Sequence, residues 1–307
     1  MKFRFRFFFC VVILILGAAQ VCLVFAKAPK TAKIAFGSKR NGNTEIYIMN
    51  PDGSQQVNLT WHAAEDFGPD WSPTGERIAF NSDRDGIRDI YLMDADGTNV
   101  RRVFQNSAHR WCPAWSPDGK QIAYLNVGDW SIYVTTIDGE QVERIVSSGF
   151  LGGCPSWSPD GSEIAFVSAP EQARRLLKAI NLQTRKERVL VPNQVPRTLW
   201  GPPAWSPDGT RIAFYWSLKG IYVVNSNGKK LKRLISNALH PAWSPRGDEL
   251  IYRRNSQLFI YNFDNQTSRR ITHGILNSAP DWFDPQFLSV QPEASLLTTM
   301  WATLKQR

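Results

Sequence analysis

The chain has 307 residues and a formal net charge of +9, with its Lys and Arg pairs scattered along the sequence. Charge of this moderate size and spread, without a nucleic-acid-binding motif, excludes nucleic acid as an expected partner. A repeat pattern occupies most of the length, so we expect no second sizeable domain beside it.

Residues 1–26 are predicted to be a signal peptide. Lys2, Arg4 and Arg6 form a basic start, and an almost uninterrupted apolar stretch follows them. Cleavage before Lys27 is expected to deliver the chain to the periplasm or the cell exterior. The charge of the exported chain is then +6, since the removed segment holds three basic residues and no acid. The alternative is an uncleaved segment that tethers the protein to a membrane.

A tryptophan recurs every 38 to 48 residues along the rest of the chain, and a tight polar turn follows most of these tryptophans. A period near forty residues is typical of repeat architectures in which each unit is one supersecondary element. The recurring residues are Trp71, Trp115, Trp157, Trp205, Trp243 and Trp282.

The second unit shows what each repeat contains. The turn from Ser72 to Gly75 has proline to preset φ and glycine for a left-handed position. In the strand that follows, Ile78 and Phe80 are expected to face one neighbouring unit and Ala79 the other. Four short strands are predicted, at residues 69–71, 77–80, 90–93 and 102–104. Four antiparallel strands in about forty residues make one blade of a β-propeller.

The two ends of the repeat region are incomplete in complementary ways. Residues 33–36 read as a second strand without a first, and the segment around Trp282 reads as a first strand without a second. Together they would complete one blade and close the ring. We therefore predict an all-β protein, a six-bladed propeller of four-stranded blades over residues 27–285, with a tail at 286–307.

The Pro-x-Trp-Ser-Pro-Asp-Gly turn, the Ile-Ala-Phe strand and the Asp-Ile-Tyr-Leu-Met-Asp strand resemble the TolB-type propeller repeat. The resemblance covers roughly residues 31–285, and the unit around Leu177-Lys178-Ala179 departs from it. It implies a six-bladed propeller in the bacterial periplasm that docks other proteins. An exported, non-catalytic and monomeric scaffold that binds another envelope protein or peptide segment is therefore the expected function.

The expected binding surface is the end of the ring opposite the Ser-Pro-Asp-Gly turns, which we call the top face. It holds the loops between second and third strands and the connections between blades, and such longer loops tend to carry function. Aromatic and basic residues gather in these segments. The predicted partner-binding residues are Trp61, His109, Arg110, Trp111, Trp200 and His240.

A second hypothesis is a carbohydrate-binding protein or a metal-dependent enzyme, lyase-like or hydrolase-like, with its site at the channel mouth. All four histidines lie in top-face segments and are its candidate ligands: His62, His109, His240 and His273. No two of them share a ligand spacing, however. The chain also lacks the Gly-x-Ser-x-Gly, His-Glu-x-x-His and glycine-rich phosphate motifs, so we expect no enzyme and no cofactor.

Two cysteines remain after residue 26, and each lies three residues before a repeat tryptophan. Cys112 and Cys154 therefore occupy equivalent positions in adjacent blades. Such positions approach bonding distance only near the axis of the ring. Two buried thiols are favoured over a disulfide, which remains the alternative.

Overall fold

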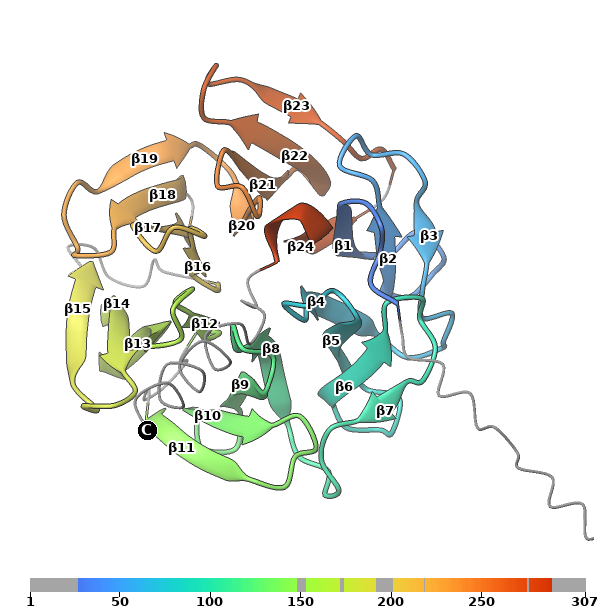
Figure 1. Cartoon of the computed structure of the whole chain (residues 1–307), viewed down its shortest axis with the longest axis horizontal. Helices are drawn as coiled ribbons and strands as arrows, with labels where there is room; N and C mark the ends of the chain where they lie inside the picture. Colours follow the sequence, from blue (N-terminus) through green and yellow to red (C-terminus); the bar gives the residue numbers. More distant parts are fainter. Residues whose placement is uncertain are drawn as a thin grey trace, which may run out of the picture.

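The computed structural model describes residues 27–147, 153–171, 174–191, 201–217, 219–274 and 276–288. These residues form six four-stranded antiparallel sheets arranged around a central axis, which is a six-bladed β-propeller (Figure 1). The one helix among them is the short 3-10 helix η1 (Pro285–Phe287). No helix in this part of the chain is long and apolar enough to span a membrane. The predicted signal peptide lies outside the described residues.

The strands of each blade are given below from the innermost to the outermost. Blade 1 contains β24 (Asn277–Phe283), β1 (Lys33–Ser38), β2 (Glu45–Met49) and β3 (Val57–Asn58). Blade 2 contains β4 (Asp66–Trp71), β5 (Arg77–Ser82), β6 (Asp89–Asp94) and β7 (Arg101–Arg102). Blade 3 contains β8 (Arg110–Trp115), β9 (Gln121–Asn126), β10 (Ser131–Thr136) and β11 (Val142–Ser147).

The other three blades follow the same order. Blade 4 contains β12 (Ser156–Trp157), β13 (Glu163–Glu171), β14 (Arg174–Asn181) and β15 (Glu187–Val191). Blade 5 contains β16 (Ala204–Trp205), β17 (Arg211–Trp216), β18 (Gly220–Asn225) and β19 (Lys232–Ile235). Blade 6 contains β20 (Leu239–Trp243), β21 (Glu249–Arg254), β22 (Gln257–Asn262) and β23 (Ser268–Arg270).

Blade 1 is built from both ends of the described chain. β1 pairs with β24 in antiparallel register, with Ile34 opposite Trp282 and Ala35 opposite Asp281. Figure 1 shows the blue and red ends of the ribbon side by side in this sheet. Each of the six sheets therefore contains four strands, and none lacks its innermost strand.

The serine of each recurring turn explains why that motif folds as it does. Ser116 is 2% exposed, and its hydroxyl accepts a hydrogen bond from the Gln121 amide, five residues later, at 2.9 Å. The hydroxyl also donates to Asp118 at 2.6 Å, so both ends of the turn are tied to one side chain. Because the hydroxyl replaces water for a buried amide, the turn can lie against the ring without an unpaired donor.

Blades pack through the alternation expected of the second strand. Ile78 and Phe80 lie in one core cluster with Ala35 of blade 1. Ala79 faces the other way and lies in a cluster with Ile122 and Tyr124 of blade 3. Large side chains thus fill one interface, and the small alanine lets the next blade approach. The core is a series of inter-blade layers, so each blade depends on its two neighbours.

Candidate functional site

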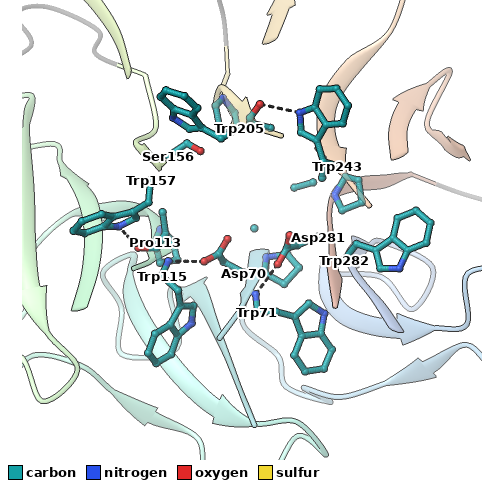
Figure 2. A pocket seen from close by; sticks show the side chains of 18 of the residues that line it. Asp70, Trp71, Pro113, Trp115, Ser156, Trp157, Trp205, Trp243, Asp281 and Trp282 are labelled. Carbon is teal, nitrogen blue, oxygen red and sulfur yellow. Dashed lines mark hydrogen bonds between the residues drawn. The ribbon is translucent and has the colours of Figure 1, made fainter. Parts of the chain in front are cut away.

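The six innermost strands surround a central channel of about 580 Å³. Its wall is formed by the Pro-x-Trp segments, and the labelled indole rings point away from the axis into the spaces between blades (Figure 2). Trp71, Trp115, Trp157 and Trp243 are buried, while Trp205 and Trp282 are partly buried. The tryptophans therefore serve mainly to pack the blades, and the residues between proline and tryptophan face the channel.

Two carboxylates join successive blades on one side of the channel. Asp281 of β24 accepts a hydrogen bond from the Trp71 amide at 2.6 Å, and Asp70 of β4 accepts one from the Trp115 amide at 2.7 Å. These bonds link blade 1 to blade 2 and blade 2 to blade 3. The two carboxylates lie on neighbouring parts of the wall (Figure 2).

Two other interfaces use the indole N–H in place of a carboxylate. Trp157 donates to the Ala114 carbonyl at 3.1 Å, and Trp243 donates to the Ala204 carbonyl at 3.0 Å (Figure 2). In blades 3, 5 and 6 the residue equivalent to Asp70 is alanine, and in blade 4 it is Ser156. The negative charge of these positions is therefore confined to blades 1 and 2.

The pKa of Asp70 is raised well above its ordinary value, first by burial and second by the nearby charge of Asp281. Burial likewise raises the pKa of Asp281. Between the unfolded and the folded pKa, a carboxyl group with a raised pKa is protonated in the folded state and ionised in the unfolded state. Such a group lowers the stability of the fold as the pH rises through this range. Its unfavourable effect is absent below the unfolded pKa of about 4, and it grows as the pH rises through the folded pKa.

We predict that Asp70→Asn stabilises the protein at neutral pH, because asparagine keeps an acceptor for the Trp115 amide and removes the charge. The stability difference between Asp70→Asn and wild type should be small below about pH 4 and widen as the pH rises. Asp70→Ala leaves the amide unpaired and should cost about 1–3 kcal/mol. Urea unfolding of the three proteins across this pH range measures both effects. A difference that shrinks with rising pH would contradict the assignment.

The position three residues before each tryptophan lies where neighbouring blades converge. Cys112 and Cys154 occupy it in blades 3 and 4 and form a disulfide, with Cα atoms 5.2 Å apart. The preference for two buried thiols was therefore wrong. The reason is that these positions lie beside the channel, where adjacent blades are much closer together than at the rim.

His240 occupies the equivalent position in blade 6, with a φ of 50°, and it lines the channel. Its ring meets the Tyr215 ring edge-on, with centroids 5.6 Å apart. Its Nδ1 is inaccessible to solvent and has no hydrogen-bond partner among the described residues. Burial, and to a lesser degree the charge of Arg253, lowers the pKa of His240 to about 4, so the ring is neutral at physiological pH.

The other histidines do not join His240. His62 accepts a hydrogen bond from the Ala64 amide at 3.1 Å, His109 is exposed on the top face, and His273 interacts with Arg270. Within the described part of the chain, no three His, Cys, Asp or Glu side chains form a group able to hold a metal ion. The four candidate ligands thus remain separate.

The predicted partner-binding residues have different environments. Trp61 is 74% exposed in the connection from β3 to β4. Arg110 is 6% exposed, and its guanidinium forms an ion pair with Asp89 at 2.9 Å. A side chain engaged in this way holds blade 3 against blade 2 and is not available to a partner. Trp200 lies outside the described residues.

Trp111 belongs to a cluster that sequence reasoning did not assemble. The Arg88 guanidinium lies 4.5 Å from the Phe67 ring centroid and 5.5 Å from that of Trp111. Trp130 packs edge-on against Trp111, with centroids 6.4 Å apart. These four partly buried side chains come from separate segments of blades 2 and 3, so no local sequence motif predicts the cluster.

The fold and the channel define the class of the protein: a six-bladed β-propeller with a narrow axial channel and variable connections at one end. The family model described as the TolB beta propeller domain matches residues 18–202 and 137–288. The chain belongs to this family.

Individual relatives match different shares of the chain. The chain is 45% identical over 49 residues to the Tol-Pal system protein TolB of Geobacter sulfurreducens, a match of 16% of this chain and 11% of that protein. TolB from Acinetobacter baumannii has a similar structure, with a TM-score of 0.72 and 20% identity over 82% of this chain. The chain spans 66% of that TolB chain, slightly less than two thirds.

More distant structures share the architecture alone. A chain of the nidogen/laminin complex has a TM-score of 0.68 at 10% identity, covering 83% of this chain and 99% of that one. Oligogalacturonate lyase in complex with manganese has a TM-score of 0.52 at 14% identity, covering 80% of this chain and 74% of that one. These likenesses concern the fold and carry no activity to this chain.

Proposed function

We propose that this chain is an exported, non-catalytic TolB-type propeller that binds another protein of the cell envelope through its top face and channel mouth. Membership of the TolB propeller family and the name of the Geobacter relative support an envelope partner. The Cys112–Cys154 disulfide supports an oxidising compartment, as does the basic and apolar character of residues 1–26.

The observation that carries the proposal is the presentation of Trp61. Its side chain is 74% exposed although its backbone has a φ of 39°, a conformation that bulky residues rarely adopt. The Asn58 side chain accepts from the Thr60 amide at 3.0 Å, and Glu45 accepts from the His62 amide at 3.1 Å. Glu45 is 3% exposed and also accepts from the Thr60 hydroxyl.

This arrangement holds an aromatic side chain in solvent on a well-anchored connection. Exposed tryptophans on ordered segments are typical anchors of protein interfaces, because they bury a large apolar area at little cost in conformational entropy. His109, Trp111 and His240 would contribute the surrounding contacts. Arg110 is left out of this set because of its ion pair with Asp89.

The test places a photo-crosslinking amino acid at Trp61 in the expressed protein. A defined adduct should form at this position and be absent when the same group replaces Asp138, which lies in a β10–β11 hairpin on the opposite end of the ring. Trp61→Ala should reduce capture of the crosslinked partner about tenfold or more, as expected for an interface anchor. Adducts of equal strength at both positions would overturn the proposal.

Export is tested separately, by the N-terminus of the protein recovered from the periplasmic fraction. Mass spectrometry should show a chain that begins at Lys27. An intact Met1 in a membrane fraction would favour the tethered alternative. Neither observation depends on which protein is bound.

A further inference from the structure

Charged and polar side chains of blades 4, 5 and 6 lie near His240, which lines the channel. Leu239 of β20 pairs with Arg253 of β21, which places Arg253 next to His240. His240 contacts Tyr215 of β17. Burial raises the pKa of Tyr215, and the charges of Arg175 and Arg253 offset part of this rise. Arg175 of β14 is itself only 7% exposed.

Among the residues that the structure describes, no carboxylate pairs with Arg253. Its one hydrogen bond to a described residue is a long contact of 3.4 Å from Nη2 to the Ser256 hydroxyl, and its Nε is buried without a partner. In contrast, the buried Arg110 and the partly buried Arg84 are paired with Asp89 and Asp66. Burial removes water from a guanidinium, and without a nearby carboxylate no ion pair compensates for this loss of solvation.

His240 adds a second unsatisfied group at the same place. Its Nδ1 is also buried without a partner, and its ring faces the channel wall and Tyr215. No carboxylate is among the charges that act on His240 or Tyr215. Two unpaired nitrogen groups, of Arg253 and His240, thus lie close together, and His240 lines the channel.

The part of the channel wall formed by blades 1 and 2 has the reverse character, because it holds the channel carboxyl groups Asp281 and Asp70. An acidic group that enters the top of the channel is therefore repelled from blades 1 and 2 and attracted toward blades 5 and 6. The channel volume of about 580 Å³ lies in the range of pockets that enclose small ligands or the end of a peptide.

We propose that Tyr215, His240 and Arg253 form a pocket that receives a carboxylate from an acidic peptide segment of the partner. This inference rests on the proposed function, since it specifies the chemistry of the segment that docks there. A planar guanidinium can hold a carboxylate through two parallel hydrogen bonds. The prolines and alanines of the channel wall suit the apolar remainder of a peptide.

The experiment uses the full chain and a fluorescein-labelled oligoglutamate, with binding followed by fluorescence anisotropy. Arg253→Gln should weaken binding about tenfold or more, the loss expected for a charged hydrogen bond. Arg253→Lys should recover part of the affinity, since lysine keeps the charge and loses the paired geometry. An oligoglutamine of equal length should not bind.

Arg254→Gln is the matched control. Arg254 is the next residue of the same strand, and its guanidinium lies over Tyr252 and Phe259 and donates to the Ser236 carbonyl. This variant should bind oligoglutamate like the wild type. Arg253→Gln should also unfold at a temperature no lower than the wild type, because it breaks no ion pair. A lowered unfolding temperature would assign Arg253 a structural role and overturn the proposal.

Three other results would overturn the pocket: equal losses in Arg253→Gln and Arg254→Gln, unchanged binding in Arg253→Gln, and displacement of the peptide by inorganic phosphate at equal concentration. The last would indicate a site for a free anion. Crosslinking at Trp61 that persists when oligoglutamate fails to bind would leave the proposed function intact and remove only this inference. Arg253-dependent peptide binding without a crosslinked partner would support the pocket and count against the docking role.

Discussion

A chain that ends at Leu276 should fail to form a cooperatively folded propeller, whereas one that ends at Leu288 should retain a single unfolding transition. The shorter chain lacks β24, so β1 loses its inner partner and blade 1 becomes a three-stranded sheet. It also loses Asp281, which accepts from the Trp71 amide across the junction between blades 1 and 2. A propeller with an open edge exposes an unpaired strand and one uncovered blade face.

Packing at the same junction increases the expected effect. Phe283 is 5% exposed, and its ring lies 5.5 Å from that of Trp71. Gly75 has a φ of 71°, and a Cβ at that position would overlap the Phe283 ring, so the turn of blade 2 is shaped around this side chain. Near-ultraviolet circular dichroism and calorimetry of the two chains test the prediction. Equal unfolding temperatures would show that ring closure contributes little.

Most of the fold is predictable from local chemistry. The recurring Ser-Pro-Asp-Gly turn carries its own hydrogen-bond partners within a few residues, as Ser116 shows with Gln121. The alternation of Ile78, Ala79 and Phe80 identifies both interfaces of a blade because strand side chains point to opposite faces. Such signals repeat in each unit, so no knowledge of distant contacts is needed to recognise a blade.

The candidate site was less predictable because its side chains find partners in other blades. Arg110 looks like a loop residue beside His109, yet it begins β8 and pairs with Asp89 of the preceding blade. The positive cluster around Arg253 and Tyr215 joins strands that are far apart in sequence. A single sequence shows residue types and spacing, whereas these contacts depend on how the blades are rotated and spaced around the axis.

The disulfide illustrates the same limit. Equivalence of Cys112 and Cys154 follows from the repeat, but their Cα separation of 5.2 Å depends on the radius at which the position lies. The Pro-x-Trp segment lines the channel, and at that radius neighbouring blades approach within bonding distance. Local patterns give the order of strands in a blade, and the closeness of two blades comes from closure of the whole ring.

Trp243→Ala should destabilise the protein by about 3–5 kcal/mol, the usual cost of removing a buried tryptophan. Trp243 is 6% exposed and stacks on Phe263 with centroids 5.0 Å apart, and the Arg211 guanidinium lies 4.5 Å from its ring. Its indole N–H donates to the Ala204 carbonyl of blade 5. Alanine therefore opens a cavity between blades, leaves a carbonyl without its donor and removes the ring beneath a cation.

Trp61→Ala is the matched control, since the same substitution at a 74% exposed position should change stability by less than about 0.5 kcal/mol. Trp243→Phe separates the contributions, because phenylalanine retains an aromatic ring for stacking and loses the N–H. It should recover most of the loss and leave a deficit of about 0.5–1.5 kcal/mol for the hydrogen bond. Urea unfolding midpoints of the four proteins give these differences. Equal destabilisation at Trp61 and Trp243 would mean that the top-face tryptophan belongs to the core, and it would remove the observation on which the docking surface rests.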